Sequence, residues 1–220
     1  MAGLLITMEG VDGSGKTTQI ERLAARLGRL GVPVAVSKEP GGTPLCQDLR
    51  ALLLTPHPSG EPWVPMAELL LFYADRAQHL ARFVRPMLAE GRVVLLDRFD
   101  DSTRAYQGAQ GVPEAVLDRL GATVLEGLKP DLTVILDLDP AASQPRAGAR
   151  NAAHGGFRET RFDEETLEFH RRGRVRFLDL AGREPGRMAV VPADGPADQV
   201  EEAVWAQVAP RLRAADQRAE

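Results

Sequence analysis

The sequence predicts an α/β domain whose central sheet is mostly parallel. Short apolar runs alternate with longer amphipathic segments along the 220 residues, which is the order expected when helices connect parallel strands. The run at 93–96 has no polar alternation, as expected for a central strand covered on both faces. The length fits one domain, and 44% hydrophobic with 26% charged residues is close to the globular average.

Five apolar runs are expected to form the strands of this sheet: Leu4–Glu9, Pro33–Ser37, Val93–Leu96, Leu132–Leu136 and Met188–Val191. The patterns between and after them predict helices: Lys16–Leu30, Leu45–Leu54, Met66–Ala89, Pro113–Leu128, Asp163–Ala181 and Pro196–Leu212. Thr55–Pro65 is rich in proline and is predicted to be a loop. Residues 141–163 are rich in Ala, Arg and Gly without clear periodicity, which predicts a mobile lid within one undivided domain.

The composition argues against several classes of protein. A single cysteine, Cys46, cannot form an internal disulfide, which suits a reducing compartment, so we expect a cytoplasmic protein. The longest apolar run, Leu69–Ala74, is far shorter than the ~20 residues of a membrane helix. The first basic residue is Lys16, so no secretory signal is expected. The net charge of −4 gives no field that would hold a nucleic acid, so any phosphate must be bound by local chemistry.

The strongest signal for function is a glycine-rich loop between the first strand and the first helix. Residues 10–17 read GVDGSGKT, which has the spacing of a phosphate-binding loop. Glycines let backbone N–H groups form an anion nest, and the helix start adds positive potential. Lys16 is expected to reach the β- and γ-phosphates, and the Thr17 hydroxyl to ligate Mg²⁺. The motif predicts a three-layer P-loop NTPase fold with a triphosphate site formed by Gly10, Val11, Asp12, Gly13, Ser14, Gly15, Lys16, Thr17 and Thr18.

The rest of the sequence favours a small kinase among P-loop proteins. A regulatory GTPase normally reads guanine with an Asn-Lys-x-Asp segment, whereas Asn151, the single asparagine here, precedes Ala-Ala-His. Motor and helicase ATPases are usually larger and carry coupling elements that are not found in this sequence. A small kinase needs a second pocket, facing the phosphate loop, for the group that accepts the phosphoryl.

Three segments are candidates for that acceptor pocket. Residues 38–43 (KEPGGT) leave the second strand at its carboxyl end, where ligands bind in open α/β sheets. Phe72 and Arg76 share a helix face and could stack on a base and bond its edge; core packing plus a surface arginine is the alternative. Asp97 ends the third strand and suits Mg²⁺ held through water, with Arg98 facing phosphate; a structural salt bridge is the alternative.

Several motifs, taken in order, resemble those of one known family. GVDGSGKTT, KEPGGT, ELLLFYADRAQH, LLDRFDDSTRAYQG, PDLTVILDLDP and RFDEE are similar to the motifs of thymidylate kinases over most of the chain. The resemblance implies phosphorylation of dTMP to dTDP by ATP with Mg²⁺, in the synthesis of dTTP for DNA, by a homodimer packed through helices. The nucleophile would be the dTMP phosphate, which needs no general base because its second pKa is ~6.

The resemblance also implies roles for individual residues. Phe72 would stack on thymine, Arg76 would donate to its O4, and Tyr106 would crowd the 2′ position and disfavour a ribose. The other residues expected around dTMP are two arginines at its phosphate, two carboxylates near the 3′-hydroxyl or the metal, and two polar residues along the base: Arg50 and Arg98, Asp12 and Glu39, and Ser102 and Gln107.

The chain departs from the family pattern in three places. Lys38 stands where the family commonly has Arg, which gives up bidentate geometry. Ser14 stands where some members carry an arginine in the phosphate loop; members without it have catalytic arginines on the lid. Pro145 would interrupt the helix that follows Asp-Pro in the family. We expect Arg150 to act in catalysis with Lys16 and Arg98, and Arg146 to contact ATP. The candidate lid arginines are Arg146, Arg150, Arg158 and Arg161.

Two other functions stay open on the sequence. One is a kinase for another nucleoside monophosphate, although Phe72, Arg76 and Gln107 all fit thymine. The other is a nucleotide-binding protein that has lost catalysis because its lid delivers no arginine. The four histidines are interpreted as surface or packing residues, and only His79 lies on the helix face of Phe72.

Overall fold

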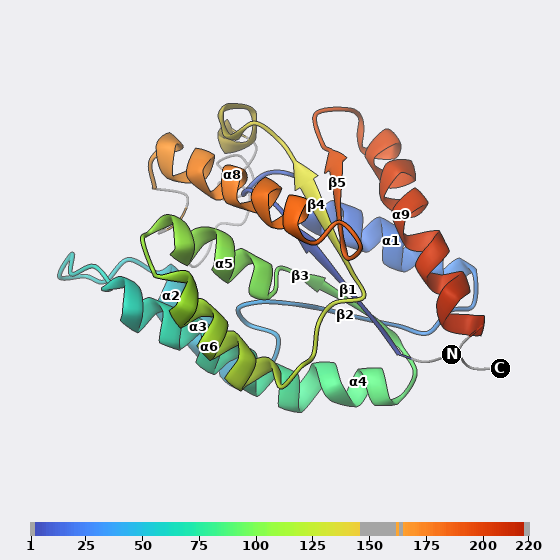
Figure 1. The fold of residues 1–220 in the computed structure, drawn as a ribbon, viewed down its shortest axis with the longest axis horizontal. Helices are drawn as coiled ribbons and strands as arrows, with labels where there is room; N and C mark the ends of the chain where they lie inside the picture. Colours follow the sequence, from blue (N-terminus) through green and yellow to red (C-terminus); the bar gives the residue numbers. More distant parts are fainter. Residues whose placement is uncertain (1–2, 146–161, 163–164, 218–220) are drawn as a thin grey trace.

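The computed structural model describes residues 3–145, 162 and 165–217. Its centre is the predicted parallel sheet of five strands, in the order β2-β3-β1-β4-β5, with helices on both faces (Figure 1). The strands are β1 (Leu4–Glu9), β2 (Val34–Lys38), β3 (Val93–Asp97), β4 (Leu132–Asp137) and β5 (Met188–Pro192). Because β1 lies between β3 and β4, the strand order changes direction beside it, which is where open α/β sheets bind ligands.

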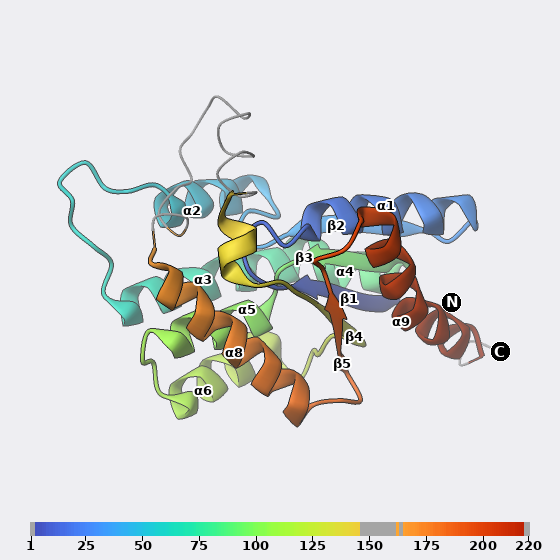
Figure 2. The same cartoon turned by 90° about the horizontal axis from the view of Figure 1, so that it is seen from above.

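The helices form the two outer layers. They are α1 (Lys16–Arg29), α2 (Pro44–Leu54), α3 (Pro65–His79), the π-helix η1 (Leu80–Val84), α4 (Arg85–Ala89), α5 (Asp100–Ala109), α6 (Glu114–Leu125), α8 (Leu167–Arg183) and α9 (Ala197–Gln217). Helices α1 and α9 cover one face of the sheet, and α5, α6 and α8 lie on the other side (Figure 2). No helix in the described part of the chain is long and apolar enough to cross a membrane.

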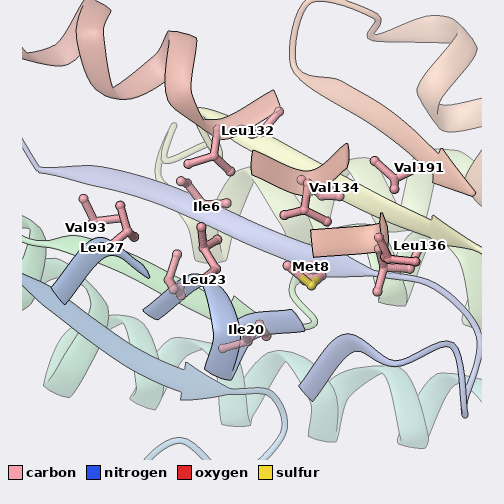
Figure 3. Packing of buried hydrophobic residues seen from close by; sticks show 14 of the residues in the cluster. Ile6, Met8, Ile20, Leu23, Leu27, Val93, Leu132, Val134, Leu136 and Val191 are labelled. Atoms are coloured by element: carbon pink, nitrogen blue, oxygen red, sulfur yellow. The ribbon is translucent and has the colours of Figure 1, made fainter. Parts of the chain in front are cut away.

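The central strand β1 is buried on both faces. Leu4, Ile6 and Met8 point toward α1 and α9 and belong to the largest apolar cluster (Figure 3). Leu5 points the other way and packs in the cluster that contains Phe99. Each fully buried aliphatic side chain stabilises the fold by roughly 1.5–3 kcal/mol, so β1 holds the loop at its carboxyl end in a fixed place.

The long helix predicted over Met66–Ala89 is present as α3, η1 and α4 in succession. The π-helical segment ends immediately before Arg85, and Pro86 follows in the first turn of α4. A proline has no N–H to donate to the carbonyl four residues earlier, so the backbone bonding shifts there. The hydrogen-bonding pattern of the helix therefore changes at a proline that the apolar periodicity does not reveal.

Two helical segments were not predicted from the sequence. Helix α5 was not predicted because its sequence is rich in polar residues and lacks an apolar stripe. Most of its side chains are nevertheless buried. Residues 140–145 are also helical, within the segment predicted to be an irregular lid. Pro145 lies at the end of that stretch, and Asp139 accepts a hydrogen bond from the backbone N–H of Ala141 at its start. The beginning of the expected lid is thus ordered, and residues 146–161 lie outside the described part.

Candidate active site

A cleft of about 1240 Å³ opens at the carboxyl ends of β1, β2 and β3. Its lining comes from the phosphate loop, the loop after β2, helix α3, and the segment that joins β3 to α5. Phe162, from the segment predicted to be the lid, also lines the cleft, so the described parts of the segments that the sequence predicted to bind ligands meet in one place. This volume exceeds the about 300–1,000 Å³ of typical small-molecule pockets.

The phosphate loop is held open by its glycines. Gly10, Gly13 and Gly15 have φ values of 135°, 78° and 95°, in the region that favours glycine. A Cβ on Gly10 would lie 2.5 Å from the carbonyl oxygen of Leu136, so the loop also packs too closely on β4 for a side chain there. Residues 12–18 line the cleft, whereas the Val11 side chain is 2% exposed and packs in the core.

Lys16 is the first residue of α1 and its side chain curls back over the loop. Its Nζ donates to the carbonyl oxygens of Gly10 and Val11, at 3.1 Å and 2.9 Å. Burial lowers the pKa of Lys16 to about 8, and the nearby Arg98 acts in the same direction. The ammonium thus lies in a region that disfavours its charge, and an anion arriving in the loop would relieve that cost.

Thr17 and Asp97 meet where the loop faces the end of β3. The Thr17 hydroxyl donates to Asp97 Oδ2 at 2.8 Å. Hydroxyl and carboxylate oxygens are the donors that Mg²⁺ prefers, and two protein ligands leave room for phosphate and water. No group of three or more His, Cys, Asp or Glu side chains that could hold a metal exists among the described residues.

Arg98 connects the phosphate loop to α5. It adopts a left-handed backbone conformation with φ 69°, which directs its side chain back over β1. Nη1 donates to Gly10 O at 3.1 Å and to Ser102 Oγ at 3.0 Å, and Nη2 donates to Asp12 Oδ1 at 2.8 Å. Burial acts to lower the pKa of Arg98, but the nearby acidic groups, of which Asp12 contributes most, together outweigh it and raise that pKa. The guanidinium thus stays charged at the centre of the cleft.

Glu9, the last residue of β1, supports Arg98 and was not singled out in the sequence. Its side chain is fully buried and accepts hydrogen bonds from Phe99 N at 2.8 Å and Ser102 Oγ at 2.5 Å. Burial raises the pKa of Glu9 to about 8, and the charge of Asp101 adds to the rise. A charged residue closing an otherwise apolar strand was the available signal, because such a group needs local partners.

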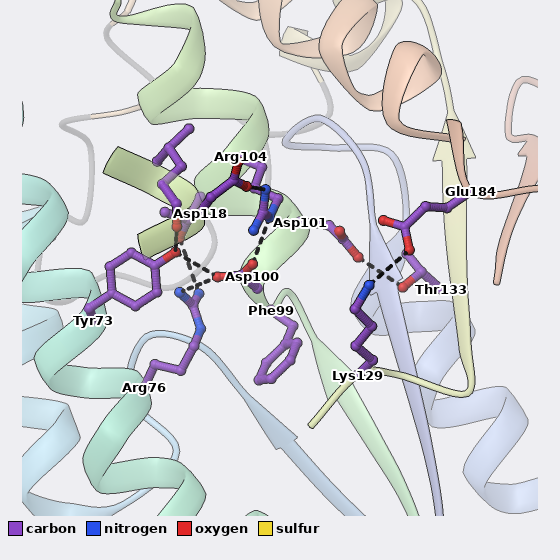
Figure 4. A network of polar contacts seen from close by, with 12 residues as sticks. Tyr73, Arg76, Phe99, Asp100, Asp101, Arg104, Asp118, Lys129, Thr133 and Glu184 are labelled. Carbon is purple, nitrogen blue, oxygen red and sulfur yellow. Dashed lines mark hydrogen bonds and ion pairs between the residues drawn. The ribbon is translucent and has the colours of Figure 1, made fainter. Parts of the chain in front are cut away.

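Arg76 lies at the other end of the cleft and is only 2% exposed, so the alternative of a surface arginine is wrong. Its Nε donates to Glu39 Oε2 at 2.8 Å, Nη1 to Asp100 Oδ1 at 3.3 Å, and Nη2 to Thr103 Oγ1 at 3.1 Å. Figure 4 shows this guanidinium pointing toward Asp100, which also accepts from the Tyr73 hydroxyl. Burial alone would lower the pKa of Arg76, but the charges of Glu39 and Asp100 raise it.

His79 supports the same carboxylate from behind. Its Nδ1 donates to Glu39 Oε1 at 2.9 Å, and its Nε2 lies 2.8 Å from the Ser37 hydroxyl. This order of hydroxyl, imidazole and carboxylate is that of a hydrolase triad. The ring is fully buried, however, and a Cβ on Gly42 would overlap it, so the backbone closes the space that an acyl intermediate would need. The arrangement positions Glu39 instead.

The loop 39–43 is fixed by two further contacts. Arg50 on α2 donates from Nη1 to Pro40 O at 2.8 Å, and its side chain lines the cleft. Asp75 on α3 accepts from Gly41 N at 2.9 Å, and burial raises the pKa of Asp75 to about 6. The loop expected to bind the acceptor is therefore shaped before any ligand arrives.

Aromatic rings form the wall beside Arg76. Phe72 is partly exposed to the cleft, and its ring centroid lies 6.1 Å from that of Phe162. Phe162 in turn lies 6.3 Å from Tyr106, which lines the cleft from α5. Gln107, one residue further on, also lines the cleft and donates to Glu68. Rings and amides of this kind suit a flat, polar-edged base.

The structure thus gathers residues 12–18 of the phosphate loop, Asp97, Arg98 and all the predicted residues of the acceptor pocket around one cleft, whereas the predicted residues Gly10 and Val11 do not line it. The predicted lid residues Arg146, Arg150, Arg158 and Arg161 lie outside the described residues. Glu9, Glu68 and His79 support the lining residues from behind, and nothing in local motif spacing singles out the first two.

Comparisons with known proteins point to one family. The family model described as Thymidylate kinase matches residues 8–204. The chain is 50% identical over 204 residues to the thymidylate kinase of Solidesulfovibrio magneticus, covering 92% of this chain and 97% of that one. It is 46% identical over 210 residues to the thymidylate kinase of Deinococcus radiodurans, covering 95% and 98%. The crystal structure of thymidylate kinase from Ehrlichia chaffeensis has a TM-score of 0.76 and 32% identity, and the match covers 94% of this chain and 100% of that one.

Proposed function

The chain belongs to the thymidylate kinase family, and from this premise we propose how its residues divide the work of the reaction. The reaction is the ATP-dependent phosphorylation of dTMP, which gives dTDP and ADP. The observation that carries the assignment of residues is the shared cleft, with an anion-binding loop at one end and a ring-and-guanidinium pocket at the other.

The phosphate-loop end holds the triphosphate of ATP. Residues 12–18 line this end and Lys16 lies over the loop with its charge disfavoured by burial. A triphosphate would accept hydrogen bonds from the backbone nest and from the helix start, and it would take over the Lys16 ammonium from the two carbonyl groups that now hold it. The Thr17 and Asp97 oxygens would hold Mg²⁺, which supplies charge neutralisation at the phosphates when bound.

The opposite end holds dTMP. Phe72 and Tyr106 offer ring faces, and Arg76 and Gln107 offer polar groups beside them. Arg50, which lines the cleft beside the loop 39–43, and Arg98, which lines it near the phosphate loop, would hold the dTMP phosphate. The base thus lies far from the phosphate loop while its phosphate points toward it.

Phosphoryl transfer then depends on alignment and charge. The dTMP phosphate is mostly dianionic at neutral pH because its second pKa is ~6, so no side chain needs to remove a proton. Lys16 and Arg98 lie where charge accumulates between the two nucleotides, and an arginine from the lid, Arg150 in our proposal, would complete the set. Closure of the lid would also exclude water, which would otherwise accept the phosphoryl.

The chain also acts as a cytoplasmic homodimer in this proposal. Several large apolar side chains of α2 and α3 are exposed: Leu45, Leu52, Met66 and Leu70 are 56%, 47%, 43% and 50% exposed. The two helices pack side by side, so these residues can contribute to one apolar surface, of the kind that a second copy would cover. Sedimentation of the protein and of Leu70→Glu tests this, because the variant should be monomeric; a wild-type monomer would contradict it.

Measuring ADP release with dTMP, dUMP, dGMP, dCMP and AMP tests the proposed function. Preferred turnover of dTMP is the expected result. Preference for another monophosphate would move the acceptor assignment, and absence of turnover with all five would point to a binding protein without catalysis.

A further inference from the structure

Behind the base end of the cleft, two buried polar side chains form a contact that the reaction itself does not need. Gln107 on α5 donates from Nε2 to Glu68 Oε1 on α3, at 2.7 Å. The two residues are 2% and 1% exposed. A carboxylate has only acceptor atoms, so the amide of Gln107 must turn its NH₂ group toward Glu68 and its carbonyl oxygen away. The contact therefore fixes the carbonyl oxygen of Gln107 on the side away from Glu68.

The side-chain carbonyl oxygen of Gln107 is available to accept a hydrogen bond in this arrangement. Gln107 lines the cleft, and its Oε1 accepts no hydrogen bond from any residue that the structure describes. This oxygen is not one of the enclosed side-chain atoms that lack a partner, so it retains some access to solvent. The amide thus presents an acceptor to the cleft. Arg76 also lines this end and can only donate, because a guanidinium has no acceptor.

We propose that Glu68 is a positioning residue that determines base specificity by locking the amide of Gln107. The proposal rests on the proposed function, in which this pocket holds the base of dTMP. Thymine offers a donor at N3 and an acceptor at O4, which matches an acceptor from Gln107 beside a donor from Arg76. Cytosine offers an acceptor at N3 and a donor at its 4-amino group, which matches neither.

A neutral partner at position 68 would remove this constraint. In Glu68→Gln the volume is retained and a hydrogen bond to Gln107 is still available, but either end of the Gln107 amide can satisfy it. The amide can then turn its NH₂ group toward the cleft and donate to a cytosine N3. Discrimination by buried hydrogen-bonding groups is strong because the wrong base leaves them unpaired, so its loss should be measurable.

The test compares kcat/KM for dTMP with kcat/KM for 5-methyl-dCMP, which differs from dTMP only at the N3 and 4 positions of the base. In Glu68→Gln the ratio of the two should fall by about tenfold or more, while KM for ATP and the melting temperature stay close to wild type. Gln107→Leu should also lower the ratio, and Glu68→Gln should add nothing in that background. The control Glu61→Gln, at an exposed loop position, should leave the ratio unchanged.

Two outcomes would overturn the proposal: an unchanged ratio in Glu68→Gln, or effects of the two substitutions that add independently. If Glu68→Gln does not fold, NMR of the wild-type dTMP complex decides, since the Gln107 side-chain NH₂ protons should show contacts to Glu68 and none to the base. Contacts to thymine would overturn the proposal. A wild-type protein inactive on dTMP would instead overturn the proposed function, so the two failures are distinguishable.

Discussion

The two ends of the cleft are built in opposite ways. The phosphate end comes from one continuous loop, residues 10–18, whose groups are mostly backbone donors with a single lysine. The base end is assembled from the loop after β2 and from α3 and α5, and its polar side chains bond to one another in the interior. The phosphate end follows from the spacing of residues within one loop, whereas the base end forms only when separate segments come together in the folded chain.

The two ends also differ in how their charges are satisfied. Within the described part of the chain, the Lys16 ammonium donates its hydrogen bonds to two carbonyl oxygens, and burial lowers its pKa to about 8. Arg76 is buried just as deeply, but the charges of Glu39 and Asp100 raise its pKa. The phosphate end is thus incomplete until an anion arrives, whereas the base end is complete beforehand. Removing the cation at each end should therefore have different consequences.

Lys16→Met should give the largest effect, a loss of at least about 10³-fold in kcat, because no other group replaces the cation at the triphosphate. Stability should stay the same or rise slightly, since a buried charge with a lowered pKa is removed. Affinity for dTMP, measured by calorimetry, should be largely unchanged. Turnover like that of the wild type would contradict the assigned role.

Arg150→Ala tests the lid, which belongs to neither end. We expect kcat to fall by about 10³-fold, the lower end of the range for a supplied arginine, and KM for dTMP to change far less. Arg171→Ala, at an exposed position of α8, is the matched control and should be silent. If kcat is unchanged in Arg150→Ala, the role passes to another lid arginine.

Arg76→Ala should damage both function and folding. It removes the guanidinium from the buried Glu39 and Asp100, which keep their other hydrogen bonds, so the free energy of unfolding should fall by about 3 kcal/mol. The kcat/KM for dTMP should fall by about 10²-fold, while ATP binding is retained. Arg76→Lys keeps the charge and should lose less of both. Denaturant unfolding measures the stability and steady-state kinetics measures kcat/KM. A stability loss below about 1 kcal/mol would contradict the expected difference between Arg76 and Lys16.

Gly42→Ala should disturb the base end alone. The new Cβ would overlap the fully buried His79 ring, which holds Glu39, so we expect a stability loss of about 1–3 kcal/mol and a several-fold higher KM for dTMP. Gly28→Ala is the control, because a Cβ there meets nothing within 4 Å on α1 and alanine favours the helix. Equal effects of the two substitutions would show that the loop 39–43 shifts to make room for the new Cβ beside His79.

A further effect, which needs no substitution, is expected on the pH dependence of ATP affinity. The lowered pKa means that the Lys16 charge, which attracts the triphosphate, is present below about pH 8 and is lost as the pH rises through that value. Between pH 7 and pH 9 the dissociation constant should therefore rise about tenfold. Calorimetry of ATP binding measures this, and dTMP binding should not follow the same curve. A Lys16→Arg variant should lose the dependence, because arginine does not titrate there.

Sequence patterns predicted those parts of the molecule that depend on neighbouring residues. The five strands emerged from short apolar runs, and the phosphate loop from the spacing of glycines, lysine and threonine between a strand and a helix. Helix α5 was missed because its buried face is polar, and the π-helical turn before Pro86 was missed because apolar periodicity does not record a lost N–H donor.

The sequence by itself determined the family, the parallel sheet and the position of the phosphate loop, because these follow from the order of residues along a short stretch of chain. Only the tertiary structure decided what stands behind the lining residues. Glu9 behind Arg98, His79 behind Glu39, and Glu68 behind Gln107 lie far apart in sequence or on different elements. A buried polar group needs a partner wherever the fold supplies one, and no local pattern records which partner that is.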